Sequence, residues 1–291
     1  MSERSDNLIK TIKEKGKNLQ AEMSFFDHLE VLRWHLIRSA IAVCIFTGLA
    51  FAYYDFIFDK IIMGPKTPSF WTYRMMCLLG ARFNLGPDFC ITKIPIEIVN
   101  NEVAGQFTLQ MNSSLMIGIV IGVPYLLYEI WRFVKPGLTD LERKSASGFV
   151  FYASMLFIVG VLFGFFIITP MSINFLANYT VSPEIKNLVT IDSYLSSVAT
   201  LTLGTGVVFE LPIIIFILSK MGIMTPKFMR STRRYAVVII LIIAAVVTPT
   251  PDIITMMTVS FPLFLLYEVS IIISSKVEKN KLKAEKGLRT Y

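Results

Sequence analysis

Residues 147–169 have the sequence SGFVFYASMLFIVGVLFGFFIIT, a run of 23 residues without a charged side chain. A helix rises about 1.5 Å per residue, so this run is long enough to cross the roughly 30 Å hydrocarbon core of a bilayer. Similar uncharged windows recur along the chain, and charged residues gather in short blocks between them. A single soluble core would not repeat such windows, so the pattern predicts several membrane-spanning helices.

Six apolar segments follow this pattern, and the last two are joined by a Pro-rich turn, Thr248-Pro249-Thr250-Pro251-Asp252. Proline ends helices, so this turn predicts a tight hairpin between two short helices. We therefore predict an all-α integral membrane protein of about six transmembrane helices, of which the fifth and sixth are short. The segments cover residues 36–54, 107–134, 147–169, 193–219, 235–248 and 253–275.

The composition agrees with a membrane protein. Hydrophobic residues make up 54% of the chain and charged residues 17%, whereas soluble domains carry about 25% charged residues. The first residues are polar and lysine-rich without an apolar core, so we expect no cleavable signal peptide. The expected organisation is a polar cytoplasmic tail at 1–24, a six-helix membrane domain at 25–275 with a long outer loop at about 55–106, and a basic cytoplasmic tail at 276–291.

The distribution of Lys and Arg predicts the orientation, because cytoplasmic loops of membrane proteins are enriched in these residues. Placing both termini in the cytoplasm assigns 22 of the 28 Lys and Arg residues to that side. The net charge of +7 then reflects anchoring against anionic lipid, and it requires no nucleic acid partner. The 22 residues fall within 1–38, 132–144, 220–234 and 276–291.

Two of the three cysteines, Cys77 and Cys90, fall in the predicted outer loop. On an oxidising face they either form a disulfide that closes the loop or remain free thiols, and we favour the disulfide. We expect no metal site there, because no histidine lies on that side. Cys44 lies within the first span, where we expect it to pack as a small apolar side chain.

Enzymatic activity finds little support in the sequence. The only histidines, His28 and His35, lie at the cytoplasmic edge of the first span, so no histidine is available at depth for a Ser–His hydrolase. Neither an H-E-x-x-H zinc motif nor a G-x-x-x-x-G-K-[ST] nucleotide loop occurs. We therefore expect a non-enzymatic protein without metal or cofactor.

Three glutamates fall within apolar segments, where charge is costly and usually has a use. Glu129 and Glu268 lie near the cytoplasmic ends of their spans, so we expect ordinary solvated or capped carboxylates there. Glu210 lies midway through its span, two residues before Pro212, which is expected to kink the helix. A carboxyl group at such a break is either neutral or faces water or a partner, and we expect a functional role for it.

Five short motifs together resemble TatC, the polytopic subunit of the twin-arginine protein translocase. Residues 25–36, FFDHLEVLRWHL, resemble the family's entry motif into the first span. WRFVKPGL at 131–138 and ERK at 142–144 resemble its first cytoplasmic loop. FELP at 209–212 resembles its mid-membrane glutamate motif, and TPTPD at 248–252 its last outer turn. The motifs occur in the family's order over about residues 25–275.

The resemblance implies a role in protein export across the bacterial inner membrane. TatC-like proteins bind the signal peptides of folded cargo proteins, which carry two consecutive arginines, and assemble with TatA-like and TatB-like single-span subunits. Transport is driven by the proton gradient. The resemblance therefore implies a multi-pass protein in an oligomeric complex, with signal peptides, these subunits and the lipid bilayer as partners.

Carboxylates suit this task, because they accept bidentate hydrogen bonds from guanidinium groups. Glu142 corresponds to the family's signal-binding glutamate, and Glu30 would complete a two-carboxylate patch. Phe133 matches an aromatic residue of the family near the same site. Arg33 and Asp27, from the entry motif, are assigned to this site as well, although a helix cap is the simpler role for Asp27.

A second set of residues is implied within and beyond the membrane. Glu210 and Pro212 would lie on a concave intramembrane face, where the signal or a partner helix packs. Asp252 would lie at the outer hairpin, as a functional residue or as a helix cap. The chain departs from the family at Val31, where a second glutamate is usual, at His35, where arginine is frequent, and in its longer outer loop.

The main alternative function is a secondary transporter or channel for a small solute. Such proteins usually contain inverted repeats with paired broken helices. The chain shows only a weak echo of this, with Pro124 before Glu129 and Pro262 before Glu268, at different spacings. A passive scaffold would explain the spans but not a glutamate at the depth of Glu210. The sequence therefore favours the export component.

Overall fold

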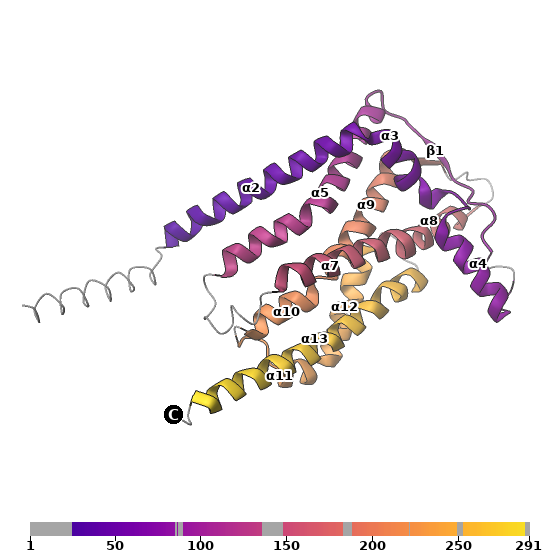
Figure 1. The fold of residues 1–291 in the computed structure, drawn as a ribbon. Helices are drawn as coiled ribbons and strands as arrows, with labels where there is room; N and C mark the ends of the chain where they lie inside the picture. The colour runs from indigo at the N-terminus through magenta and orange to yellow at the C-terminus, as the bar shows by residue number, and fades with distance from the viewer. Residues whose placement is uncertain are drawn as a thin grey trace, which may run out of the picture.

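A computed structural model describes residues 25–84, 86, 90–135, 148–182, 188–220, 222–248 and 253–288 (Figure 1). Nearly all of the described chain is helical, and its long helices lie side by side as a bundle. The main elements are α2 (Phe25–Ala52), α5 (Gly105–Val134), α7 (Phe149–Phe163), η5 (Gly164–Ile168), α8 (Thr169–Asn178), α9 (Ile191–Val208), α10 (Leu211–Lys220), α12 (Arg233–Val247) and α13 (Ile253–Leu288).

Among the residues that the structure describes, five stretches are long and apolar enough to cross a membrane: Leu29–Ala52, Gly105–Val134, Phe149–Asn178, Ile191–Lys220 and Thr255–Asn280. The third and fourth are composite, because each joins consecutive helical elements. The remaining predicted span, the fifth in chain order, is α12, whose 15 residues measure about 22 Å. The fifth helix in chain order is therefore short, as predicted.

The sixth helix is longer than predicted, because α13 extends over 36 residues and continues beyond the apolar segment. Its last turns contain Lys, Glu, Ala and Leu, which are strong helix formers that hydropathy does not detect. The backbone of residues 276–288, expected to form a basic tail, therefore continues the helix of the last span. Pro262 lies within α13.

The first two spans, α2 and α5, pack closely along their length (Figure 1). Glycine makes the contact possible: a Cβ atom on Gly118 would lie 2.2 Å from Thr47 Oγ1 and 2.7 Å from the Thr47 backbone nitrogen. One turn further along α5, a Cβ atom on Gly122 would lie 2.9 Å from a Val43 methyl group. Small residues at membrane helix interfaces allow such close backbone approach.

Replacing Gly118 with leucine is expected to force α2 away from α5 and to lower the free energy of unfolding by about 1–3 kcal/mol or more. Gly48→Leu is the matched control, because a Cβ atom on Gly48 has no neighbour within 4 Å. Thermal unfolding of both variants in detergent tests the expectation. Equal unfolding temperatures for the two would contradict the packing described here.

The third and fourth spans also meet through glycines, since a Cβ atom on Gly164 would lie 2.0 Å from Thr205 Oγ1. The fourth span breaks at Phe209 and Glu210, between α9 and α10. The predicted kink before Pro212 is therefore confirmed. After the break, α10 packs against α13, and α12 packs against the other part of α13.

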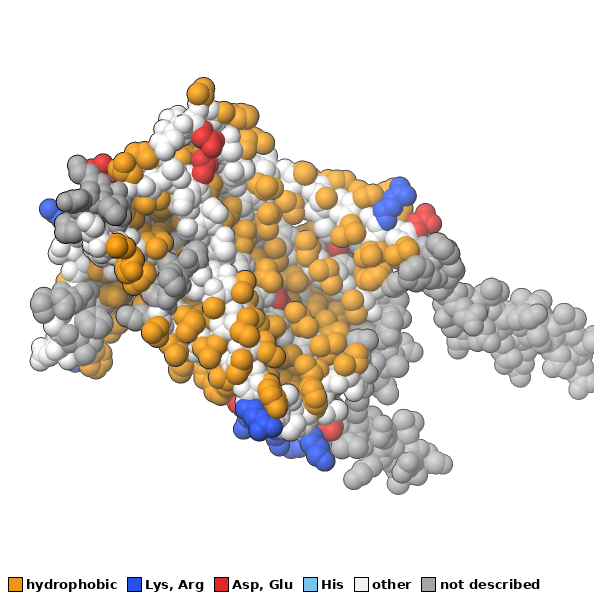
Figure 2. Space-filling model, turned by 180° about the vertical axis from the view of Figure 1, so that it is seen from behind, with side chains coloured by type: hydrophobic (Ala, Val, Ile, Leu, Met, Phe, Trp, Pro, Cys, Tyr) orange, Lys and Arg blue, Asp and Glu red, His pale blue; other side chains and the backbone are white. Residues whose placement is uncertain are grey.

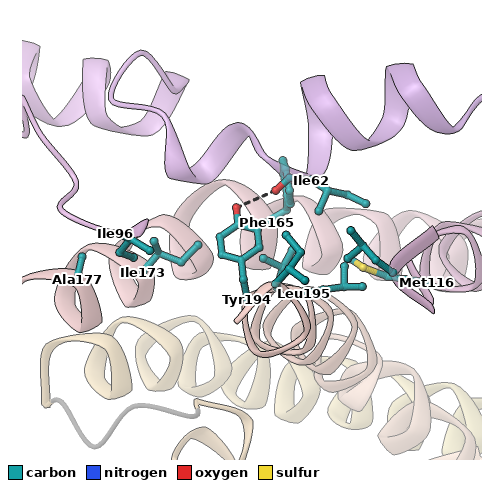
Figure 3. Packing of buried hydrophobic residues seen from close by; sticks show 11 residues of the cluster. Ile62, Ile96, Met116, Phe165, Ile173, Ala177, Tyr194 and Leu195 are labelled. Carbon is teal, nitrogen blue, oxygen red and sulfur yellow. Dashed lines mark hydrogen bonds between the residues drawn. The ribbon is translucent and has the colours of Figure 1, made fainter. Parts of the chain in front are cut away.

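A compact outer assembly covers the end of the bundle opposite the start of α2 and the end of α13 (Figure 1). Its elements are α3 (Tyr54–Phe56), η1 (Ile57–Ile62), η2 (Gly64–Lys66), α4 (Trp71–Phe83), and the parallel strands β1 (Glu97–Val99) and β2 (Leu188–Thr190). Tyr194 donates a 2.8 Å hydrogen bond to the Ile62 carbonyl within its apolar core (Figure 3). Cys77 and Cys90 form a disulfide in this assembly.

The beginning of α2 and the ends of α5 and α13 lie at the same end of the molecule (Figure 1). Between the two ends, hydrophobic side chains cover most of the described surface on the face that Figure 2 shows, while Lys and Arg side chains lie toward its edges. This distribution suits a bundle surrounded by lipid. The arrangement of the helices brings the start of α2 and the end of α5 together (Figure 1). The predicted signal site requires this, because its residues come from both segments.

Candidate functional site

Glu129 is buried, which corrects the expectation of a solvated or capped carboxylate. It is 1% exposed, and its Oε2 forms a hydrogen bond with Nδ1 of His35, 94 residues earlier in the chain. Tyr125 donates a 2.9 Å hydrogen bond to Oε1 of the same carboxylate. Both carboxylate oxygens therefore have partners. We refer to His35, Tyr125 and Glu129 as the α2–α5 clasp.

The clasp fixes the entry segment of α2 against the cytoplasmic end of α5. Burying ionisable groups is costly, and it is tolerated when their hydrogen-bonding capacity is filled. Ser39 donates a 2.9 Å hydrogen bond to the His35 backbone carbonyl, and the Phe133 ring meets the His35 ring edge-on at 6.0 Å. The predicted site residue Phe133 therefore lies directly beside α2.

Glu30 and Arg33 are exposed on α2, on the side of His35 that leads out of the bundle. Glu30 precedes His35 by five residues, which corresponds to about 7.5 Å along the helix axis. The Arg33 guanidinium lies over the Trp34 ring, 5.8 Å from its centroid. The backbone of Asp27 is helical, but its side chain lies outside the described part of the chain, as does Glu142.

Glu210 lies at the break between α9 and α10 and is 8% exposed. Its backbone carbonyl accepts hydrogen bonds from the amides of Ile213, at 2.9 Å, and Ile214, at 3.1 Å, as α10 begins. Neither oxygen of its buried carboxyl group has a hydrogen-bond partner within the described residues. Pro212 lines an apolar groove between α7, α10 and α13. Asp252 lies outside the described residues.

Glu268 matches the expectation of an ordinary carboxylate. It accepts a 2.7 Å hydrogen bond from Arg233, and both side chains are partly exposed. Exposed pairs of this kind contribute at most about 1 kcal/mol. No group of His, Cys, Asp and Glu suited to hold a metal ion occurs among the described residues.

The sequence profile of the family described as "Sec-independent protein translocase protein (TatC)" matches residues 27–262 of the chain. The chain belongs to the TatC family. It is a subunit of a Sec-independent protein translocase and not an enzyme, and it is a multi-pass protein of the bacterial inner membrane.

Relatives within the TatC family align over almost the whole chain. The TatC protein of Blattabacterium sp. subsp. Periplaneta americana is 37% identical over 266 residues, which cover 91% of this chain and 100% of the relative. The TatC protein of Aquifex aeolicus is 31% identical over 266 residues, which cover 91% of this chain and 100% of that relative.

Two crystal structures described as the twin-arginine translocase receptor TatC share the fold. One has a TM-score of 0.66 at 30% identity and covers 85% of this chain and 99% of its own. The other has a TM-score of 0.62 at 28% identity, with coverage of 86% and 99%. The predicted all-α membrane fold and the resemblance to the TatC family are thereby confirmed.

The clasp is the feature that the sequence analysis missed. The position of Glu129 near the membrane surface, taken alone, predicts a solvated carboxylate, and that of His35 indicates no partner. The available signal was that both lie near the same end of consecutive, antiparallel spans, so that they share a depth in the membrane. Two ionisable side chains at one depth on neighbouring helices are candidates for a pair.

Proposed function

We propose that this TatC-family subunit binds the twin-arginine signal peptides of folded proteins at the end of the α2–α5 pair. The observation that carries the proposal is the exposed Glu30 on a helix that the clasp holds beside Phe133. A carboxylate accepts hydrogen bonds only, so it complements the five donors of a guanidinium group. Glu142 would supply the second carboxylate, and Asp27 and Arg33 would border the site.

A basic environment makes such carboxylates selective. Arg33 and Arg132 are exposed at this end of the helix pair, and they disfavour non-specific binding of cationic peptides. A twin-arginine peptide overcomes this by forming bidentate hydrogen bonds, which lysine cannot form with the same geometry. Specificity for arginine over lysine is therefore the property that distinguishes this site from a general acidic patch.

Binding of a fluorescent twin-arginine signal peptide to the purified chain tests the proposal. Replacing both arginines with lysine is expected to weaken binding by at least about tenfold, as are Glu30→Gln and Glu142→Gln, because each removes charge-assisted hydrogen bonds worth about 1.5–3 kcal/mol. Glu278→Gln is the matched control, since Glu278 is an exposed carboxylate near the end of α13. Equal binding of both peptides, unchanged by the glutamate variants, would refute the site.

We further propose that the chain nucleates a proton-motive-force-driven export complex with TatA-like and TatB-like subunits, and that Glu210 meets a polar group of the signal or of a partner helix. Supporting this, both buried carboxyl oxygens of Glu210 lack a hydrogen-bond partner among the described residues. A polar group in this state is costly unless another molecule completes its hydrogen bonds. The alternative, a small-solute transporter, predicts uptake by the purified chain alone.

A further inference from the structure

Helix α4 of the outer assembly carries an exposed apolar stripe. Its large apolar exposed side chains lie seven, eight and twelve residues after the first of them. At about 100° per residue this places them within one arc of roughly 140° around the helix. The opposite face is buried, including Tyr73 and Gly80. The stripe consists of Trp71, Leu78, Leu79 and Phe83, which are 57%, 64%, 48% and 68% exposed.

The stripe cannot turn inward, because several contacts fix the orientation of α4. The Thr72 hydroxyl donates a hydrogen bond to the Phe166 carbonyl. The Tyr73 hydroxyl lies 2.9 Å from the carbonyl oxygens of Pro65 and Pro170. The disulfide of Cys77 holds the middle of the helix to Cys90. The apolar face therefore points away from the protein in the folded chain.

The contact between Trp71 and Phe166 sets the depth of α4 in the membrane. Their ring centroids lie 6.0 Å apart. Phe166 follows the start of α7 at Phe149 by 17 residues, or about 26 Å along the span. Phe149 is the first residue of the third span. With Phe149 placed at the inner boundary of a hydrocarbon core about 30 Å thick, Phe166 falls near the outer boundary. Trp71 therefore lies at the level where tryptophan is enriched in membrane proteins.

The charges of α4 complement anionic headgroups. The helix contains Arg74 and Arg82, both exposed, and no Asp or Glu. Arg82 falls within the arc of the stripe and Arg74 falls beside its edge. Both long side chains can extend from an interfacial helix toward the phosphates, while Trp, Leu and Phe lie among the lipid chains. A protein partner would have to match both a large apolar stripe and the arginines within and beside it, whereas lipid provides both environments at this depth.

We propose that α4 lies in the outer-leaflet interface, with its apolar stripe among the lipid chains and Arg74 and Arg82 on the phosphates of anionic phospholipids. The helix then anchors the outer assembly to the bilayer. The Cys77–Cys90 disulfide links α4 covalently to the segment that leads into β1 and α5. This role is independent of signal binding, which takes place at the opposite end of the bundle.

Quenching of tryptophan fluorescence by brominated lipids tests the proposal with the purified full chain in anionic vesicles. The contribution of Trp71 is the difference between the wild type and Trp71→Phe, which keeps a ring against Phe166. This contribution is expected to be quenched more strongly by lipids brominated near the headgroup than by lipids brominated near the chain end, and to be shielded from aqueous acrylamide.

The double variant Leu78→Asp/Phe83→Asp is expected to lose this quenching, while Ala81→Asp retains it, since Ala81 is exposed on α4 away from the stripe. A disulfide that remains intact on a non-reducing gel shows that the variants are folded.

The quenching of Trp71 by brominated lipid is expected to be stronger in anionic than in zwitterionic vesicles. The variant Arg74→Gln/Arg82→Gln is expected to lose this difference. Full quenching of the Trp71 signal by acrylamide would overturn the proposal, and so would shielding from both acrylamide and brominated lipid, which would indicate a second copy on the stripe.

Discussion

Replacing Glu129 with leucine is expected to lower the free energy of unfolding by about 3–5 kcal/mol, the typical cost of removing one partner from a buried ionisable pair. The substitution leaves the His35 ring without its hydrogen-bond partner in a site where His35 is only 9% exposed. It also removes the acceptor of the Tyr125 hydroxyl. Unfolding of the purified chain in detergent, followed by circular dichroism, measures the effect.

Two further variants separate the two causes of this loss of stability: the broken hydrogen bonds of the pair, and the change in packing that the substitution makes. Glu129→Gln keeps an acceptor for Tyr125 and a hydrogen-bonding group for His35, so it is expected to cost about 0.6–1.7 kcal/mol, the range of hydrogen bonds between membrane helices. His35→Leu/Glu129→Leu is expected to recover most of the stability, because neither partner remains buried alone. His35→Leu alone completes the cycle. A loss of stability in the double variant equal to the sum of the losses in His35→Leu and Glu129→Leu would show that the clasp contributes no coupling.

The clasp also connects stability with function. Glu30, Arg33 and Phe133 lie on the two helices that it joins, close to the point where it joins them. Loosening α2 from α5 is therefore expected to weaken signal binding in Glu129→Leu even though no proposed contact residue is changed. Recovery of binding in His35→Leu/Glu129→Leu would indicate that signal binding depends on the placement of α2 against α5 and not on the charge of Glu129.

Most of the spans could be predicted because uncharged runs of membrane length have few alternative explanations. The break at Phe209 and Glu210 was likewise predictable, since Pro212 removes a backbone donor and clashes with the preceding turn. The length of α13 was not, because hydropathy marks where lipid lies and not where a helix ends. Residues 276–288 remain helical through the intrinsic preference of their side chains.

The candidate site was predictable in its residue types and less so in its contacts. Exposed Glu30 and the buried break at Glu210 follow from local sequence, whereas the hydrogen bond between His35 and Glu129 joins residues 94 positions apart. The orientation of α4 depends equally on distant partners, namely the carbonyl groups of Phe166 and Pro170. Local patterns report burial and helix ends, but pairing requires the packing of whole spans.

The second buried glutamate, Glu210, is expected to respond to leucine with the opposite sign. Its carboxyl oxygens have no hydrogen-bond partner among the described residues, so Glu210→Leu removes an unsatisfied polar group and loses no bond seen in the structure. The free energy of unfolding is expected to rise by about 1–3 kcal/mol. Export of a twin-arginine reporter protein, in cells that depend on the variant, is expected to be lost or strongly reduced.

A gain in stability together with a loss of export is the signature of a residue retained for function at the expense of the folded state. Glu268→Leu is the control, because it removes a partly exposed carboxylate whose pair with Arg233 contributes at most about 1 kcal/mol. That variant is expected to leave export near the wild-type level. A destabilised Glu210→Leu protein would instead mean that the carboxyl group is satisfied within the chain, and normal export by this variant would remove Glu210 from the proposed mechanism.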